Sequence, residues 1–208
     1  MKQVDINDIS NYKACYKKDY SVYACIPESD TIIINRFNNP ELYVRLGKKD
    51  FFTAEQVHKH NLLQKYSEYI QNGQLQVVKD SCICLYGTVG ELQLISIREF
   101  VNTYTFENNQ QITSQNIDRL GDNWCVVTPI KPMLDIMYSA CFVPKIQIEH
   151  LGRMTVNDSY VNHGKGDFIV CDSINGKPNM NTRRVVNGLI FANTYNNQGW
   201  TNCISSAN

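Results

Sequence analysis

The chain has 208 residues, 43% of them hydrophobic, and its 20 basic and 20 acidic residues cancel. This length suffices for one medium domain or two small ones, each with a core of its own. Zero net charge excludes a global field for anionic partners, so general nucleic-acid binding is not expected. No run approaches the roughly 20 apolar residues of a membrane-spanning helix, and MKQVDINDIS lacks the apolar stretch of a signal peptide. We therefore expect a cytoplasmic protein with no membrane partner.

The first fifty residues contain three short extended segments, YSVYACI, TIIIN and ELYVRL, which are rich in branched and aromatic residues. An amphipathic helix is predicted next, over about residues 54–71. Thr53 and Gln56 have the capping-box spacing at its start, and Asn72 with Gly73 is a stop signal. His58 and His60 are two positions apart on this helix and point in different directions, so they do not form a metal pair.

Extended segments resume after the helix. LQVVKDSCICLYGTVGELQLIS predicts two or three strands with a turn from Gly87 to Gly90. The polar stretch ENNQQITSQNIDRLGDN has the composition of a linker with one short helical turn. Beyond it, MLDIMYSACFVP is open to a helical interpretation, and KIQIEHLGRMTV resembles a hairpin that turns at Leu151 and Gly152. These patterns predict an N-terminal unit at 1–106, a linker at 107–122 and a C-terminal β-rich unit at 123–208.

Eight cysteines raise the question of a metal site or of disulfides. No CxxC pair occurs, and only Cys82 and Cys84 stand close together, whereas a zinc ribbon or knuckle needs two close pairs. Alternation along a strand places both of these side chains on one face. We expect reduced cysteines that pack as small hydrophobic residues, with no metal and no cofactor.

Two similar pentapeptides, FVNTY at 100–104 and FANTY at 191–195, indicate an internal repeat. Each follows an aspartate, a short apolar stretch, a glycine-containing turn and a second extended stretch. Ser96 and Asn187 both stand four residues before the phenylalanine and are good helix N-caps. Each copy is therefore predicted to end in a short capped helix whose Phe and Tyr pack on one side. Chance similarity in an asparagine-rich chain is the alternative.

The predicted fold class is α+β, with short antiparallel strands, one substantial amphipathic helix and a duplicated strand-turn-strand-short helix unit. The second copy has the longer and more basic turn, at 175–184. If duplication built the protein, this difference between the copies marks the candidate working surface.

The second copy also resembles a known family. GKGDFIVCDSINGKP followed by IFANTY is similar to small phage and prophage proteins with a Pro-Gly-Asp-Tyr-Ile/Gly (PGDYG-like) signature, which usually end in Phe-x-x-Thr-Tyr. The residues that carry the likeness are Gly166, Asp167, Phe168, Ile169, Phe191, Thr194 and Tyr195. Lys165 replaces the usual proline, and the long helix is extra. The family has no settled activity, so the resemblance implies a phage or mobile-element setting in a bacterial host without a mechanism.

Few motifs suggest chemistry. No Walker loop, GxSxG elbow, HExxH or paired-carboxylate motif occurs. The loop HGKGD at 163–167 could cradle a phosphate on backbone amides beside His163 and Lys165; alternatively, its glycines make the turn before a strand. Cys141 is the least improbable nucleophile, with His163 later in the chain, but nothing in the sequence brings the two together. We assign no catalytic residue.

Basic residues near the second pentapeptide form the remaining candidate site. Arg183 and Arg184 are adjacent in an extended segment, so they point to opposite faces. One is expected to face the core and pair with a carboxylate. The other, with Lys177 and Lys165, would contact a phosphate or an acidic partner, unless these are ordinary surface charges.

The leading functional hypothesis is a non-enzymatic phage or mobile-element accessory protein that binds a host or phage protein, for example as an inhibitor of antiviral defence. Twelve tyrosines favour such binding, since Tyr and Arg are common in interface hot spots. A small-ligand or nucleotide binder that uses the HGKGD loop with Arg183 and Arg184 is the alternative, and a cysteine-dependent enzyme is the third hypothesis. A homodimer is compatible with each.

Overall fold

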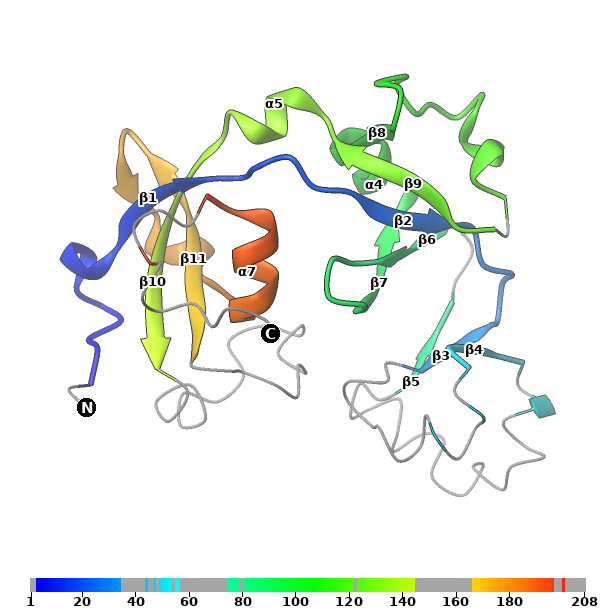
Figure 1. The fold of residues 1–208 in the computed structure, drawn as a ribbon, viewed down its shortest axis with the longest axis horizontal. Coiled ribbons are helices and arrows are strands. Elements are labelled where there is room, and N and C mark those ends of the chain that lie inside the picture. The colour runs from blue at the N-terminus through cyan, green and yellow to red at the C-terminus, as the bar shows by residue number, and fades with distance from the viewer. Residues whose placement is uncertain are drawn as a thin grey trace. The chain divides into compact units, whose positions relative to one another are not determined.

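The computed structural model describes residues 3–34, 44, 47, 49–53, 55–56, 75–78, 81–121, 123–144, 166–196 and 200. The chain forms two compact units (Figure 1). Unit 1 comprises Met1–Tyr20 and Lys131–Asn208, and unit 2 comprises Ser21–Ile130. Both contain mainly antiparallel strands with short helices, so the predicted α+β class is confirmed. No helix in the described part of the chain is long and apolar enough to cross a membrane.

Unit 1 is built on one antiparallel sheet with the order β1-β10-β11-β13. Its strands are β1 (Lys13–Tyr16), β10 (Met137–Pro144), β11 (Gly166–Ile174) and β13 (Arg184–Val186), and β12 (Lys177–Pro178) pairs with the end of β11. The helical elements are η1 (Ile9–Asn11), α5 (Lys131–Leu134), η4 (Met180–Thr182) and α7 (Gly188–Thr194).

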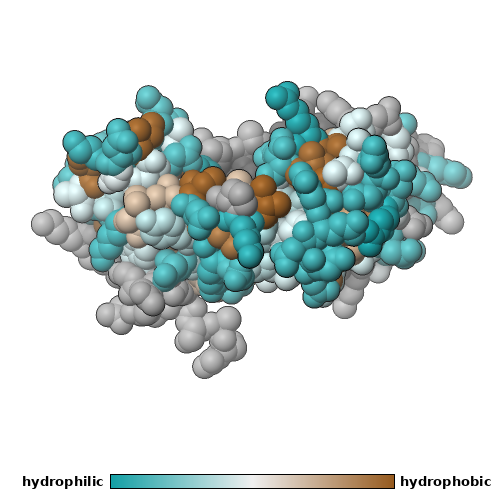
Figure 2. Space-filling model, turned by 90° about the horizontal axis from the view of Figure 1, so that it is seen from above, coloured by the Kyte–Doolittle hydropathy of each residue, from teal (hydrophilic) through white to brown (hydrophobic). Residues whose placement is uncertain are grey.

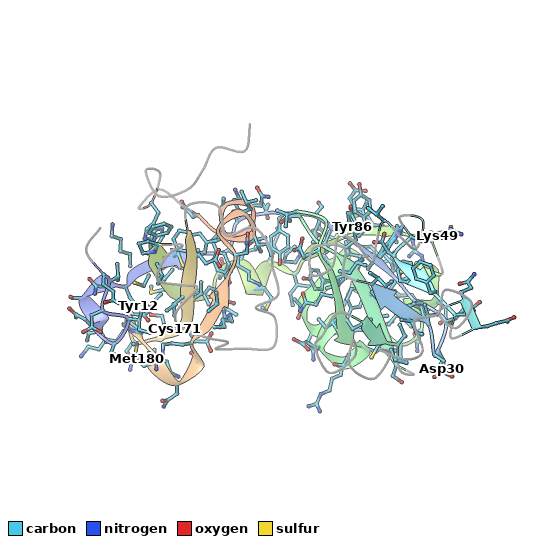
Figure 3. The ribbon with its side chains drawn as sticks, turned by 90° about the horizontal axis from the view of Figure 1, so that it is seen from below. Tyr12, Asp30, Lys49, Tyr86, Cys171 and Met180 are labelled. Carbon is cyan, nitrogen blue, oxygen red and sulfur yellow. The ribbon has the colours of Figure 1, made fainter. Side chains whose placement is uncertain are left out.

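Both faces of the unit 1 sheet are covered. Helix α7 covers one face, where Phe168, Phe191 and Trp200 form a buried aromatic cluster. The N-terminal segment covers the other face: Val4 and Ile6, together with Met180, pack on a cluster that includes Tyr12, Cys141, Ile169 and Cys171. Tyr12, Cys171 and Met180 lie together in Figure 3. The sequence supports this arrangement because alternate residues of β10 and β11 are apolar on both faces.

Unit 2 contains a five-stranded antiparallel sheet with the order β7-β6-β2-β9-β8. Its strands are β2 (Val22–Cys25), β6 (Cys82–Tyr86), β7 (Leu92–Ser96), β8 (Tyr104–Phe106) and β9 (Cys125–Pro129). A three-stranded sheet, β4-β3-β5, is formed by β3 (Ile32–Ile34), β4 (Phe51–Phe52) and β5 (Leu75–Val77). The helical elements are α4 (Ile97–Thr103) and η3 (Ile117–Leu120). Cys25, Ile33, Val78, Cys84 and Leu92 form the core between the sheets.

The two large sheets share one pairing pattern. Order β13-β11-β10-β1 in unit 1, continued by a bridge from Lys17 to Tyr195, corresponds to order β7-β6-β2-β9-β8 in unit 2. In each of the following comparisons the first residue pair belongs to unit 1 and the second to unit 2. Phe168–Val186 corresponds to Ile83–Ile95, and Val170–Ala140 corresponds to Leu85–Ala24. Tyr138–Cys15 corresponds to Val22–Val127, and Tyr195–Lys17 corresponds to Tyr104–Pro129. Each position in one sheet therefore has a counterpart in the other, which we define by this register.

The first strand of each half of the chain lies in the sheet that is built mainly by the other half. Strand β1 belongs to unit 1 although β2, β6 and β7 belong to unit 2; β9 belongs to unit 2 although β10, β11 and β13 belong to unit 1. The units therefore differ from the expected division into 1–106 and 123–208. The stretch 107–122 is no linker, because Ile112, Ile117 and Leu120 are buried in unit 2. Composition indicated a loop, but three spaced apolar side chains anchor it.

The predicted local features of the repeat are confirmed. Ser96 accepts a hydrogen bond from the backbone N–H of Glu99 at the start of α4, and Asn187 accepts one from Leu189 at the start of α7. The rings of Phe100 and Tyr104 stack with their centres 5.4 Å apart. Those of Phe191 and Tyr195 stack at 4.8 Å.

The capping box is also confirmed, because Thr53 N–H donates to Gln56 Oε1 at 2.9 Å and Gln56 N–H donates to Thr53 Oγ1 at 3.2 Å. The rest of the predicted helix lies outside the described residues, together with His58 and His60, as do most of ELYVRL and the hairpin expected at Leu151 and Gly152. The turn from Gly87 to Gly90 is present, closed by a hydrogen bond from Gly87 N–H to Glu91 O at 2.7 Å.

A helical interpretation of MLDIMYSACFVP is wrong for most of its length. Helix α5 ends at Leu134. Strand β10 begins at Met137, and its residues from Tyr138 to Cys141 are buried. Pairing with β1 on one side and β11 on the other outweighs the helical tendency of the Met and Leu residues.

Candidate functional site

Arg183 and Arg184 point to opposite faces of the unit 1 sheet, as their adjacency predicts. Arg184 Nη1 lies 3.3 Å from Asp172 Oδ1, so the expected pairing of one arginine with a carboxylate is confirmed. Arg183 instead donates from Nε to Met180 O and from Nη1 to Asn7 Oδ1, both at 2.9 Å. These bonds tie Arg183 to the segment that covers the opposite face.

Arg184 lies among aromatic side chains on the α7 face. Its guanidinium is 5.3 Å from the ring centre of Tyr138, and it also donates to the hydroxyl of Tyr195. Both tyrosines are buried. Burial raises the pKa of Tyr195 to about 12, although the charge of Arg184 opposes this rise. The tyrosines are therefore neutral at physiological pH and hold the guanidinium through ring contact and hydrogen bonding.

Lys17 reaches the same end of the sheet. It follows β1, shares a face with Cys15 by alternation, and its backbone bridges Tyr195. Burial, and then the positive charge of Arg184, lower the pKa of Lys17. The sequence analysis did not select Lys17, because nothing in its surroundings indicates that β1 lies in the same sheet as Arg184.

Of the other predicted basic residues, only Lys177 is described, and it lies apart from these side chains. Lys177 is exposed on β12, and His163 and Lys165 lie outside the described residues. The described part of HGKGD has a structural role: Asp167 Oδ1 accepts a hydrogen bond from Gly188 N–H at 3.0 Å, at the start of α7. Gly166 begins strand β11 opposite Pro144. The described residues of the loop thus belong to strand β11, and the turn expected before it lies outside the described residues.

Cys141 is a packed core residue. Its side chain is 1% exposed, and burial raises the pKa of its thiol to about 11. A nucleophilic cysteine needs a lowered pKa and access to substrate. The environment of Cys141 therefore disfavours the enzyme hypothesis.

Unit 2 carries a row of aromatic side chains that the sequence analysis missed, formed by Tyr23, Tyr86 and Trp124. Tyr23 and Tyr86 are direct partners in β2 and β6, with ring centres 6.4 Å apart, and Tyr86 lies 5.8 Å from Trp124. Tyr23 is 48% and Trp124 39% exposed. Alternation in VYAC could have shown that Tyr23 points away from Val22, but only strand register brings the three rings together.

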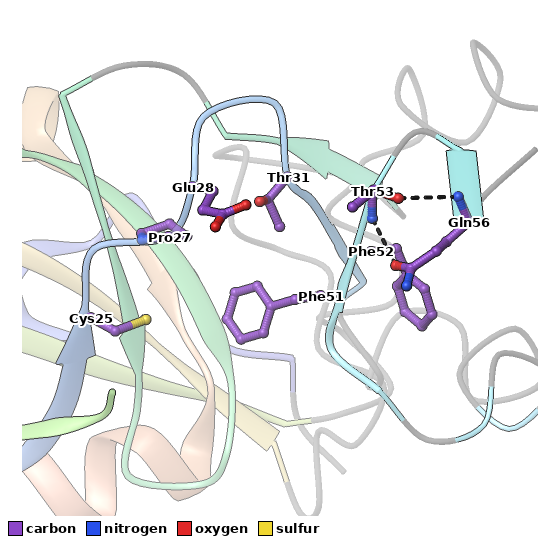
Figure 4. A pocket seen from close by; sticks show the side chains of 8 residues that line it. All are labelled: Cys25, Pro27, Glu28, Thr31, Phe51, Phe52, Thr53 and Gln56. Atoms are coloured by element: carbon purple, nitrogen blue, oxygen red, sulfur yellow. Dashed lines mark hydrogen bonds between the residues drawn. The ribbon is translucent and has the colours of Figure 1, made fainter. Parts of the chain in front are cut away.

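A pocket of about 300 Å³ adjoins the aromatic row. Phe51 joins the two, because its ring lines the pocket and lies 5.8 Å from that of Trp124. Figure 4 shows Phe51 between Cys25 on one side and Phe52 and Thr53 on the other, with Glu28 and Thr31 beside it. Among the described residues of 26–56, the charged side chains are Glu28, Asp30, Asp50 and Glu55, against Lys49 alone.

Exposed large hydrophobic side chains are few on the described surface. Figure 2 shows apolar patches within a mainly polar exterior. Besides Tyr23 and Trp124, these side chains are Ile9, Tyr16, Val44, Ile136 and Ile174. In the part of the chain that the structure describes, no three His, Cys, Asp or Glu residues gather as metal ligands.

Comparison with protein-family models, curated proteins and solved structures found no match to this chain. Two features of the described residues remain as candidate sites, the aromatic row of unit 2 with its pocket and the basic end of the unit 1 sheet.

Proposed function

We propose that this chain is a non-enzymatic accessory protein of a phage or other mobile element, which acts by binding a protein of the bacterial host. Its binding surface is the aromatic row of Tyr23, Tyr86 and Trp124 with the adjoining pocket. The observation that carries the proposal is the exposure of Tyr23 and Trp124 on a paired sheet. The mobile-element setting rests on the PGDYG-like resemblance.

The aromatic row has the properties of an interface hot spot. Exposed aromatic surface costs roughly 25 cal/mol per Å² relative to burial, and Trp and Tyr are the residues most enriched in hot spots. The ring-to-ring contacts hold the side chains on a rigid sheet, so little conformational entropy is lost on binding. A partner therefore gains apolar contact without having to order this surface.

The counterpart surface in unit 1 indicates what would cover the row. By register, Tyr23, Tyr86 and Trp124 correspond to Ser139, Cys171 and Tyr12, all of which are buried. The N-terminal segment lies over them, with Val4 and Ile6 packed on the cluster and Tyr12 Oη donating to Ile6 O at 2.9 Å. We infer that an extended segment of the partner covers the unit 2 surface in the same way.

Charge narrows the chemistry of that segment. Among the described residues that line the pocket, Glu28 alone is charged. Aromatic faces also attract cations. The partner segment therefore carries a lysine or arginine whose side chain packs against the rings of the aromatic row and whose charge pairs with Glu28.

We also infer that the two units arose by duplication of a strand-turn-strand-short helix unit. The shared register, the caps at Ser96 and Asn187, and the stacked Phe and Tyr of each pentapeptide support this inference. Binding function then belongs to positions where the copies differ, and the aromatic row is one such set.

Affinity capture from bacterial lysate tests the proposed function. Wild-type protein should retain one stoichiometric partner, and the purified partner should bind it in a calorimetric titration. Tyr23→Ser with Trp124→Ala should weaken this binding about 100-fold, since each hot-spot side chain contributes roughly a tenfold factor or more. Ile174→Ser, which removes a 57% exposed side chain from unit 1, should leave affinity unchanged.

Circular dichroism and thermal unfolding should show that the variants remain folded. A partner retained equally by wild type and by the double variant would refute the role of the row. Absence of any stoichiometric partner would refute the function itself.

A further inference from the structure

The basic end of the unit 1 sheet forms a distinct cluster on the α7 face, which we call the Lys17–Arg184 cluster. It consists of Lys17, Tyr138, Asp172, Arg184 and Tyr195. Tyr138 and Asp172 are direct partners in β10 and β11, Arg184 pairs with Asp172, and the Lys17 backbone bridges Tyr195. Three strands, the residue after β1 and the end of α7 thus supply these polar groups.

Two cations outnumber the one carboxylate of this cluster. Arg184 is bonded to Asp172, whereas the only side-chain partner found for the Lys17 ammonium among the described residues is the ring of Tyr20, 5.9 Å from its centre. The Arg184–Asp172 distance of 3.3 Å is also longer than the usual ~2.7–2.9 Å of a charge-assisted bond. The cluster therefore has spare capacity for a negative charge.

Arg184 and Asp172 are accessible from solvent, and Lys17 is half-buried. The side chain of Arg184 is 34% exposed and that of Asp172 is 48% exposed, although the tyrosines that support them are buried. Ring contact with Tyr138 and the hydrogen bond to Tyr195 hold the guanidinium in place. A planar, positioned guanidinium with an ammonium on the same face of the sheet is suited to the oxygen atoms of a phosphate group.

Unit 2 provides an internal control, because its sheet has the same register without these charges. The counterparts of Lys17, Asp172, Arg184 and Tyr138 are Pro129, Gly87, Gln93 and Val22. Of the five residues, only Tyr195 has the same residue type at its counterpart, Tyr104. The Glu91 carboxylate fills the space beside Gly87, with no cation at the counterparts of Lys17 and Arg184. The fold thus forms without a cationic pair, whose mutual repulsion and desolvation carry a cost.

From these observations we propose that the Lys17–Arg184 cluster binds a phosphate-bearing anion, such as a phosphate monoester or a diphosphate. Lys17 and Arg184 contact the anionic oxygens, and Asp172 yields part of its hold on Arg184 when the anion binds. The site lies in unit 1 and is independent of the protein-binding surface proposed in unit 2.

Calorimetric titration with pyrophosphate, inorganic phosphate and adenosine monophosphate tests the site, with sodium chloride at matched ionic strength as the control. Wild type should bind at least one of these anions. Lys17→Gln should weaken that binding about tenfold because it removes a charged contact. Lys177→Gln removes the same charge from exposed β12 and should change nothing.

Two further variants separate a binding role from a structural one. Lys17→Arg keeps the charge and should restore most of the affinity. Asp172→Asn removes the competing carboxylate, so it should tighten binding, whereas a merely structural ion pair predicts weaker binding. Tighter binding of adenosine monophosphate than of inorganic phosphate would assign the ligand to the nucleotides; equal binding would assign it to the phosphate group alone.

The proposal is overturned if wild type binds none of the three anions, or if Lys17→Gln and Lys177→Gln weaken binding equally. Capture of the protein partner should be the same with Lys17→Gln as with wild type. The two proposals therefore fail separately.

Discussion

Buried thiol and phenol groups of unit 1 make its stability sensitive to alkaline pH. Burial raises the pKa of Cys141 to about 11, and it raises those of Cys15, Tyr12 and Tyr195 to about 12. The folded state therefore keeps protons that the unfolded state releases above the ordinary pKa values of 9.0 and 10.0. The contribution of these groups to the free energy of unfolding is fully present below pH 9 and is lost as the pH rises above this value. Lys17 acts in the opposite direction, since its pKa is lowered.

We predict that Cys141→Ala flattens the loss of stability between pH 9 and about 11. The free energy of unfolding, measured by urea titration with a reductant present, should fall less steeply for the variant, by on the order of 2 kcal/mol across this interval. Slopes are compared because the lost side chain also lowers stability at neutral pH. Parallel curves for the two proteins would contradict the prediction.

At the scale of elements, two glycines allow close packing at the start of β11, Gly188 against β11 itself and Gly166 against β10. A Cβ on Gly188 would lie 2.4 Å from the backbone oxygen of Gly166, and a Cβ on Gly166 would meet Val143 and Pro144 backbone atoms. Asp167 then caps Gly188 N–H. Gly166, part of the HGKGD stretch that the sequence leaves open to a phosphate-loop interpretation, is required by its close approach to β10, and Gly188 is required by the close approach of α7 to β11.

Substitution of Gly188 by alanine distinguishes close packing from helix propensity. In an unobstructed helix alanine is more favourable than glycine by about 1 kcal/mol. Here the contact with Gly166 should reverse the sign and destabilise the protein by on the order of 2 kcal/mol in chemical denaturation. Ile97→Ala at the counterpart position of α4 serves as a comparison without such a clash. A stabilised Gly188→Ala protein would show that the helix does not approach the strand this closely.

At the scale of the whole molecule, the exchange of first strands joins the two halves of the chain. Strand β1 pairs with β10, and β9 pairs with β2 and β8, so each half of the sequence completes a sheet of the other. The connection through residues 107–111 is exposed and suitable for cutting.

A protease site inserted between Asn108 and Asn109 tests this interlocking. After cleavage under native conditions the two fragments should co-elute in size-exclusion chromatography and separate only in denaturant. Independent units at 1–106 and 123–208 would instead separate after cleavage without denaturant. Uncut protein carrying the same insertion is the control for effects of the insertion itself.

Local physics made much of this protein predictable from its sequence. Side-chain capping, strand alternation and the preference of Phe and Tyr for one side of a short helix depend on residues a few positions apart. They correctly indicated the caps at Ser96 and Asn187, the capping box at Thr53 and Gln56, and the opposite directions of Arg183 and Arg184.

Only the tertiary structure decided which strands pair and hence which distant side chains meet. The sequence by itself determined the α+β class and the repeated helix ends, since these follow from local spacing. It did not determine that β1 and β9 change units, because hydrogen bonding between strands carries little sequence preference. The aromatic row of Tyr23, Tyr86 and Trp124 and the Lys17–Arg184 cluster both depend on that pairing.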